Sequence, residues 1–221
     1  MTTTTNATPT DVHDMVVVHR VFRRELRLIP ELVRRVRPGD TARAGVLAAH
    51  ARLVLTGLHG HHTAEDELLW PKLLERCTPD AELVHRMEAQ HERVHEALEA
   101  LGPALDRWEA EARPAVGEEV ASSLDALRTA LVEHLDDEER EILPLAARHI
   151  TQAEWDALGE HGVSKTKFRE MPILFGAVAE EATPEEMVHI LSTVPPPVRF
   201  LLRTVLARQY RRYISRVREV R

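Results

Sequence analysis

The sequence has little of what marks secreted, membrane-spanning or nucleic-acid-binding proteins. It contains one cysteine in 221 residues, which excludes an internal disulfide and favours a reducing, cytoplasmic location. No run approaches the ~20 apolar residues of a membrane-spanning helix. The Thr-rich segment 1–10 lacks the apolar stretch of a signal peptide. The formal net charge of -7 argues against nucleic acid as a partner, because phosphate contacts require a basic surface.

Lysine is also scarce, since only Lys72, Lys165 and Lys167 contribute to the 29 basic residues. Such an arginine excess is typical of GC-rich bacterial genomes and suggests a bacterial source. We find no Gly-rich phosphate loop, and the single cysteine, Cys77, has no paired base that would make it a nucleophile.

Strand patterns are absent, and apolar residues instead recur every three or four positions between Pro and Gly breaks. This pattern predicts an all-α protein with four long helices at about 11–37, 41–76, 80–113 and 115–149. Long helices with short connections are typical of an up-down-up-down four-helix bundle. We therefore predict a disordered polar tail over residues 1–10 and a bundle over residues 11–150.

Residues 151–221 are predicted to form a helical extension packed on the bundle. Helix starts are indicated at Thr151 and Thr183, and a basic last helix at about 198–220. Residues 199–221 hold eight arginines and one glutamate, which permits contact with a membrane surface or a partner. We favour docking on the acidic bundle, because apolar residues recur there at helical spacing. They are Phe200, Leu201, Val205, Leu206, Tyr210 and Ile214.

Histidine is what the sequence has in excess, with 13 residues concentrated before residue 150. The segment from His61 aligns with the segment from His134 at an offset of 73, and each has a glutamate four residues later. His19 aligns with His91 at an offset of 72. The bundle is therefore predicted to use one helical hairpin twice.

Residues four apart lie on one helix face, so the repeat predicts a set of inward-facing ligands from all four helices. Imidazole suits iron, zinc and copper, and carboxylates can bridge two metals. His95 aligns with Arg23, so one metal is expected to have three histidines and the other two, with an open position. The predicted ligands are His19, His61, Glu65, His91, His95, His134 and Glu138.

Two of these assignments have neighbouring alternatives. His62 could replace His61, although the repeat favours His61, and Glu139 could replace Glu138. The eight remaining histidines, including His50 and His62, are interpreted as surface or capping residues.

This order of motifs over residues 11–150 resembles the hemerythrin family, including its bacterial HHE cation-binding domains. The resemblance implies two non-haem iron ions with an oxo or hydroxo bridge. His91, His95 and His134 would bind one iron, His19 and His61 the other, and Glu65 and Glu138 would bridge. It also implies oxygen binding or sensing, or the handling of peroxide or nitric oxide. A peroxide-decomposing, catalase-like enzyme is the alternative. The acid lies four residues after His134, whereas oxygen carriers have an Asp five residues after the histidine.

Two other readings compete. The sequence His91-Glu92-x-x-His95 matches the zinc-metalloprotease motif, but that function would leave four of the predicted ligands without a role. A ferritin-like di-iron oxidase needs Glu-x-x-His pairs on different helices, whereas both candidate pairs here fall on one predicted helix.

Overall fold

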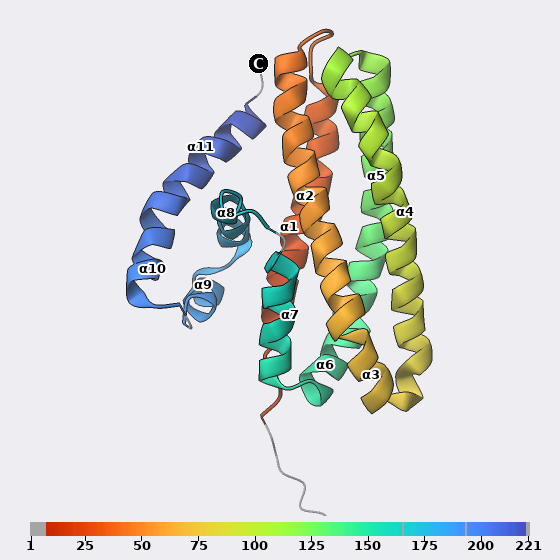
Figure 1. Ribbon diagram of the computed structural model, residues 1–221, viewed down its shortest axis with the longest axis vertical. Helices are drawn as coiled ribbons and strands as arrows, with labels where there is room; N and C mark the ends of the chain where they lie inside the picture. The colour runs from red at the N-terminus through yellow and green to blue at the C-terminus, as the bar shows by residue number, and fades with distance from the viewer. Residues whose placement is uncertain (1–7, 165, 193, 220–221) are drawn as a thin grey trace, which may run out of the picture.

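The computed structural model describes residues 8–164, 166–192 and 194–219, and all regular elements within these ranges are helices. A bundle forms the body of the molecule, in which each long helix contacts two others in the cyclic order α1, α2, α4, α5 (Figure 1). The predicted all-α class and helical bundle are confirmed. Residues 1–7 of the predicted tail lie outside the described ranges. The four helices are α1 (His13–Arg34), α2 (Thr41–Leu68), α4 (Ala81–Glu111) and α5 (Pro114–Asp137).

Two predicted long helices are interrupted near their C-terminal ends. The helix predicted at about 41–76 is broken at Leu69 and continues as α3 (Trp70–Arg76), which is followed by a short 3-10 turn, η1 (Thr78–Asp80). The helix predicted at about 115–149 passes through a π-helical turn, η2 (Glu138–Ile142), into α6 (Leu143–His149). Prolines at positions 71 and 144 lack the N–H that would continue the helical ladder. The π turn matters for the site, because it starts at Glu138.

The buried apolar residues form two clusters with a polar layer between them. On α1 the boundary lies between Met15 of one cluster and Phe22 of the other. On α4 it lies between Met87 and Val94. Each bundle helix thus contributes polar side chains at one level of an otherwise apolar core. Along the described ranges, no helix combines the length and apolar character needed to cross a bilayer.

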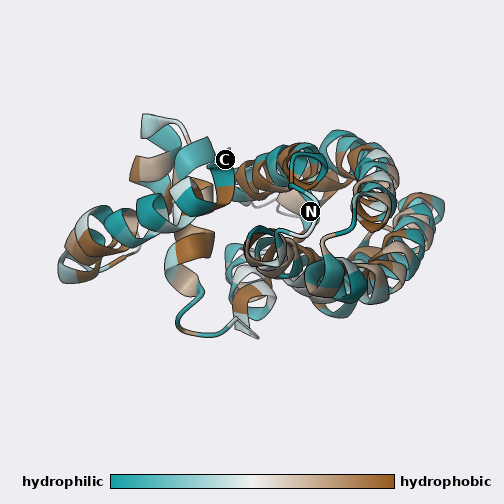
Figure 2. Cartoon of the chain, turned by 90° about the horizontal axis from the view of Figure 1, so that it is seen from above, coloured by the Kyte–Doolittle hydropathy of each residue, from teal (hydrophilic) through white to brown (hydrophobic). Residues whose placement is uncertain are grey.

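The segment after the bundle lies along one side of it (Figures 1 and 2). Its first helix packs on α2, and its second contacts both α1 and the last helix. Capping bonds are present at both predicted starts, Thr151 and Thr183. We did not predict α8, whose continuous apolar run from Ile173 has no helical period. The helices are α7 (Gln152–Ser164), α8 (Met171–Glu181), α9 (Pro184–Ile190), α10 (Pro196–Leu201), the π turn η3 (Leu202–Leu206) and α11 (Ala207–Arg218).

The last predicted helix contacts the rest of the molecule through only part of its predicted apolar face. Tyr210 and Ile214 on α11 are buried, whereas Phe200, Leu201 and Val205 are 43–70% exposed. α11 approaches α8 closely because residue 176 is glycine. A Cβ atom at that position would lie 2.2 Å from Cγ of Tyr210.

A buried polar cluster joins α11 to the bundle. Glu25 on α1 is 2% exposed, and its carboxylate lies 3.0 Å from Nε2 of His50 on α2. His50 Nδ1 lies 2.9 Å from the hydroxyl of Tyr213. Arg24 and Arg218 also contact Glu25. Because three helices share this carboxylate, its ionisation is expected to control how firmly α11 is held.

Acidification is therefore expected to weaken the fold through Glu25. Burial opposes its ionisation, but hydrogen bonding and charge from His50, together with Arg24, lower its pKa to about 2. A carboxyl with a lowered folded-state pKa stabilises the protein above its unfolded pKa, and this contribution is lost as the pH falls through the folded value. Between pH 6 and pH 2.5, the wild type is expected to lose about 2 kcal/mol more than Glu25→Gln. Urea unfolding at both pH values measures this difference, and equal losses would contradict it.

Candidate metal centre

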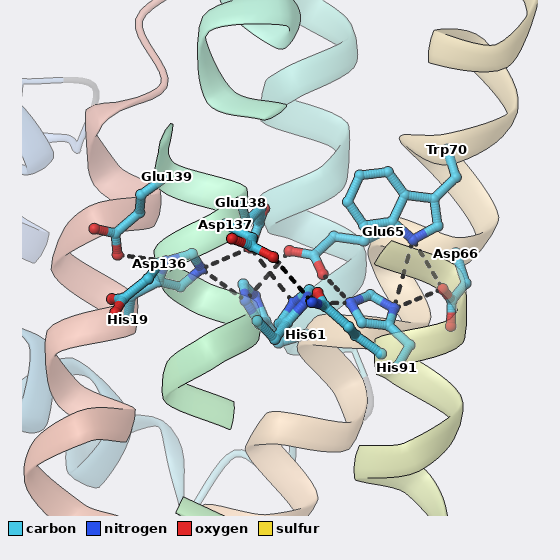
Figure 3. A network of polar contacts seen from close by, with 12 residues as sticks. His19, His61, Glu65, Asp66, Trp70, His91, Asp136, Asp137, Glu138 and Glu139 are labelled. Atoms are coloured by element: carbon cyan, nitrogen blue, oxygen red, sulfur yellow. Dashed lines mark hydrogen bonds and ion pairs between the residues drawn. The ribbon is translucent and has the colours of Figure 1, made fainter. Parts of the chain in front are cut away.

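Histidine and glutamate side chains from all four bundle helices meet in the polar layer between the apolar clusters (Figure 3). They form two groups, and within each group the ligand atoms lie within 4.8 Å of one another. Glu65 belongs to both groups, so the two lie side by side. The first group is His19, His61, Glu65 and Glu138, and the second is His62, Glu65, His91 and His134.

In the two-histidine group, nitrogen and oxygen atoms converge on one point. Nε2 of His19 lies 3.2 Å from Nε2 of His61 and 3.3 Å from Oε2 of Glu138. Nε2 of His61 lies 3.2 Å from Oε1 of Glu65. Two ligand atoms, each about 2.1 Å from one metal ion, are separated by roughly 3 Å. The separations in this group therefore fit a single shared ion.

In the three-histidine group, His91, His134 and Glu65 have similar separations. Nε2 of His91 lies 3.1 Å from Nε2 of His134 and 3.3 Å from Oε2 of Glu65. The His62 ring stacks on the His91 ring, with centroids 4.0 Å apart. The two oxygens of Glu65 thus face different groups, as expected of a carboxylate that bridges two metals.

Outer acceptors hold the opposite edges of these imidazole rings. The Nδ1–H of His19 donates to Glu139 at 2.9 Å, and that of His91 donates to Asp66 at 2.7 Å. Nδ1 of His134 lies 3.1 Å from Oε1 of Gln90. Because Nδ1 carries the proton in this arrangement, Nε2 is left as the free ligand atom. Such carboxylate–histidine pairs orient the ligands of metal sites and raise their basicity.

A third layer holds these acceptors in place. The indole N–H of Trp70 donates to Asp66 at 2.9 Å. The guanidinium of Arg23 donates to Glu139 at 2.6 Å and to Asp136 at 2.7 Å. These contacts position Asp66 and Glu139 before any ion binds.

Several buried polar atoms in the centre have no hydrogen-bond partner among the residues that the structure describes. They are both carboxylate oxygens of Glu65, both of Glu138, and Nε2 of His62. These three side chains are between 0% and 5% exposed. Both oxygens of Glu65 and Oε2 of Glu138 instead face imidazole nitrogens at 3.2–3.7 Å. Buried charged groups are normally paired or coordinate a metal, because leaving them unsatisfied costs several kcal/mol. The residues present therefore fit metal cations.

The pKa values of residues in the centre are also shifted by burial and by neighbouring charges. Burial and the charge of Glu138 raise the pKa of Glu65 to about 7. For His19, burial lowers the pKa, but the Glu138 charge and bonds to Glu138 and Glu139 outweigh it and raise the value to about 9. Burial lowers the pKa of His61 to about 3. Without a metal, the centre holds protons that a bound cation would displace.

The structure brings six of the seven predicted ligands together and leaves out His95. The His95 side chain is 44% exposed and lies 3.4 Å from Glu99, with its ring stacked on that of His59. It lines a solvent-facing pocket beside the three-histidine group. The third histidine of that group is His62. Glu138, and not Glu139, belongs to a group, since Glu139 serves as the acceptor for His19.

His61 and His62 therefore both face the centre, one toward each group. Consecutive helical residues point about 100° apart, so adjacent histidines can flank the shared Glu65. The interpretation of His62 and His50 as surface residues is wrong, because they are 5% and 3% exposed. The repeat contained a signal for His62, since its counterpart at an offset of 73 is Leu135, a fully buried core residue.

The protease motif is not assembled as a site. His91 is buried and belongs to the three-histidine group, whereas His95 projects into the solvent-facing pocket. Glu92, the would-be general base, is exposed. In zinc proteases both histidines of this motif bind one metal, an arrangement that the described residues do not form.

Comparison with known families gives one match. The hemerythrin family, described as the hemerythrin HHE cation binding domain, matches residues 10–146. Searches of curated proteins and of solved structures returned no match. The matched range includes both groups of candidate ligands and ends before α7.

Proposed function

This chain belongs to the hemerythrin HHE cation-binding domain family, and we propose that its bundle holds two non-haem iron ions that bind O2 or a related small oxidant. The two ions would be held by the two groups around Glu65. The single observation that carries the proposal is the set of buried carboxylate oxygens and one imidazole nitrogen that belong to these groups and lack a hydrogen-bond partner.

Iron suits this mixed set of donors. Imidazole binds iron, zinc and copper, whereas carboxylates favour harder ions. Two histidines with two glutamates, beside three histidines with one glutamate, combine both kinds of ligand. His62 takes the place that the sequence assigned to His95 in this ligand set. A shared carboxylate allows the two ions to act together.

The two groups differ in a way that favours ligand binding at one of them. The group of His19 and His61 has one histidine fewer than the other, and Oε2 of Glu138 also lies 3.7 Å from Nε2 of His134. If Glu138 bridges both ions as Glu65 does, the ion of the two-histidine group would have one protein ligand fewer and would keep a position open for a small molecule. Iron supplies the change of oxidation state that O2, peroxide or nitric oxide chemistry requires. The chain keeps His19 oriented through Glu139, and an apolar cluster lies on either side of the polar layer that contains the site.

Metal content tests the proposal directly. The full chain, purified from iron-supplemented cells, is expected to contain about two irons per chain and to show near-ultraviolet bands that disappear on chelation. A matched sample grown with zinc shows whether the site selects iron. One zinc per chain, with no iron bound under either condition, would contradict a di-iron site.

A second measurement separates binding from catalysis. Reversible uptake of O2 by the reduced protein, with peroxide consumed only in proportion to protein, would indicate a carrier or sensor. Peroxide consumption over many turnovers per chain would instead indicate a catalase-like enzyme. We favour the binding function. Protein purified from the same cells and treated with chelator is the control for both assays.

A further inference from the structure

A cavity of about 190 Å³ lies between the bundle and the segment that follows it. Val18 and Phe22 of α1 and Val54 of α2 form one wall. Helices α7, α8 and α11 form the opposite wall, with Leu158, Ile173 and Ile214 among the residues that they contribute. Residues beyond 146 supply that wall, so the extension adds this cavity to the family domain.

The walls offer little to a charged ligand. The charged side chains that line the cavity already have partners. Asp14 accepts the indole N–H of Trp155 at 2.9 Å, and Glu25 is held by His50. Tyr210 donates its hydroxyl proton to Glu180 at 2.5 Å. An anionic ligand would lose its hydration here without gaining a free positive counter-charge.

The size of the cavity selects the class of ligand. An apolar cavity of about 150 Å³ takes up benzene and remains free of water when empty. A cavity of about 190 Å³ with an apolar wall on each side therefore fits a molecule slightly larger than one six-membered ring. Burial of that apolar surface would drive binding.

We propose that the cavity binds an uncharged apolar organic molecule of about the size of one substituted six-membered ring. His61 lines the same cavity, so the bound molecule would lie beside the two-histidine group. The binding itself does not depend on metal. Its test therefore uses the full chain as purified, whatever its metal content, and its failure is distinct from failure of the di-iron proposal.

Toluene is the probe, and benzoate is its charged counterpart. By calorimetry on the full chain as purified, toluene is expected to bind with a dissociation constant on the order of 0.1 mM. Benzoate is expected to bind at least 10-fold more weakly. No binding of toluene up to its solubility limit, or equal affinity for benzoate, would overturn the proposal.

Gly57 provides a variant that fills the cavity. It lines the cavity, and a Cβ atom there would meet only the ring of Phe22, at 4.0 Å. Gly57→Leu is expected to weaken toluene binding at least 10-fold. Gly102→Leu is the matched control, because a Cβ at this other helical glycine meets nothing within 4 Å and the residue does not line the cavity. Equal toluene affinity in both variants would overturn the proposal.

Methyl NMR locates the probe in the wild type and does not depend on how the variants fold. Added toluene is expected to shift the methyl resonances of Ile173 and Ile214, which line the cavity. The resonance of Ile142, buried in the other apolar cluster, is the internal reference and is expected to stay in place. Shifts at Ile142 without shifts at Ile173 and Ile214 would overturn this location.

Discussion

Replacing His62 with alanine is expected to leave about one iron per chain, whereas replacing His95 with alanine is expected to leave both. His62 belongs to the three-histidine group, and its Nε2 is buried without a partner. His95 is 44% exposed and lies beside Glu99. Loss of a direct ligand removes more affinity than loss of an outer partner, which itself costs 10- to 100-fold. We therefore expect the iron of the three-histidine group to bind at least 100-fold more weakly in His62→Ala.

The two variants are matched, because both remove one imidazole that lines the same solvent-facing pocket. Iron is measured per chain after gel filtration, together with the near-ultraviolet bands. The opposite result, two irons in His62→Ala and one in His95→Ala, would restore the ligand set derived from the sequence. Loss of iron in both variants would mean that His95 moves inward when metal binds.

Much of the fold could be predicted because the bundle helices have a strong period and clear breaks. Asp40 illustrates this, since it follows Pro38-Gly39 and its side chain caps α2 by accepting the backbone N–H of Arg43. The parts that were missed depend on less local effects. α8 is an apolar run without a period, and its position depends on close contact between Gly176 and Tyr210. Such a contact between distant residues leaves no local pattern.

The candidate site was predicted less completely, because spacing alone does not show which way a helix faces. A separation of four residues placed His91 and His95 on one face, yet of these two only His91 belongs to a candidate group. Direction is set by how α2 and α4 are rotated against their neighbours, which depends on the whole core. The repeat contained part of this information, since Leu135, the counterpart of His62, lies in the core.

The choice between Glu138 and Glu139 also depended on tertiary structure. The π turn begins at Glu138, and such turns occur often at functional sites because they alter the direction of side chains locally. Glu138 enters the centre, and Glu139 reaches the far edge of the His19 ring. Consecutive acids in the sequence thus lie in different places, one in a candidate group and one beside the His19 ring, which their spacing from His134 does not distinguish.

Replacing Glu65 with glutamine is expected to abolish binding of both irons and the stability that they confer. Glu65 is the residue shared by both groups, and an amide carries no charge to balance two cations. Ligands present at 100 times their dissociation constant stabilise a protein by about 2.7 kcal/mol per site. Two sites are then expected to raise the melting temperature of a chain of this size by roughly 10–20 °C. In Glu65→Gln, the melting temperature is expected to be the same with and without iron.

Asp66→Asn is the matched control for this variant, because it makes the same acid-to-amide change at the next residue of α2. Asp66 supports His91 from outside the centre, so this variant is expected to keep both irons with 10- to 100-fold lower affinity. Iron content and calorimetric melting, each with and without iron, measure the two effects. One iron retained in Glu65→Gln would show that Glu65 serves a single ion. The unpartnered oxygens of Glu65 would then need a different explanation, because their burial is the main physical reason to place two cations side by side.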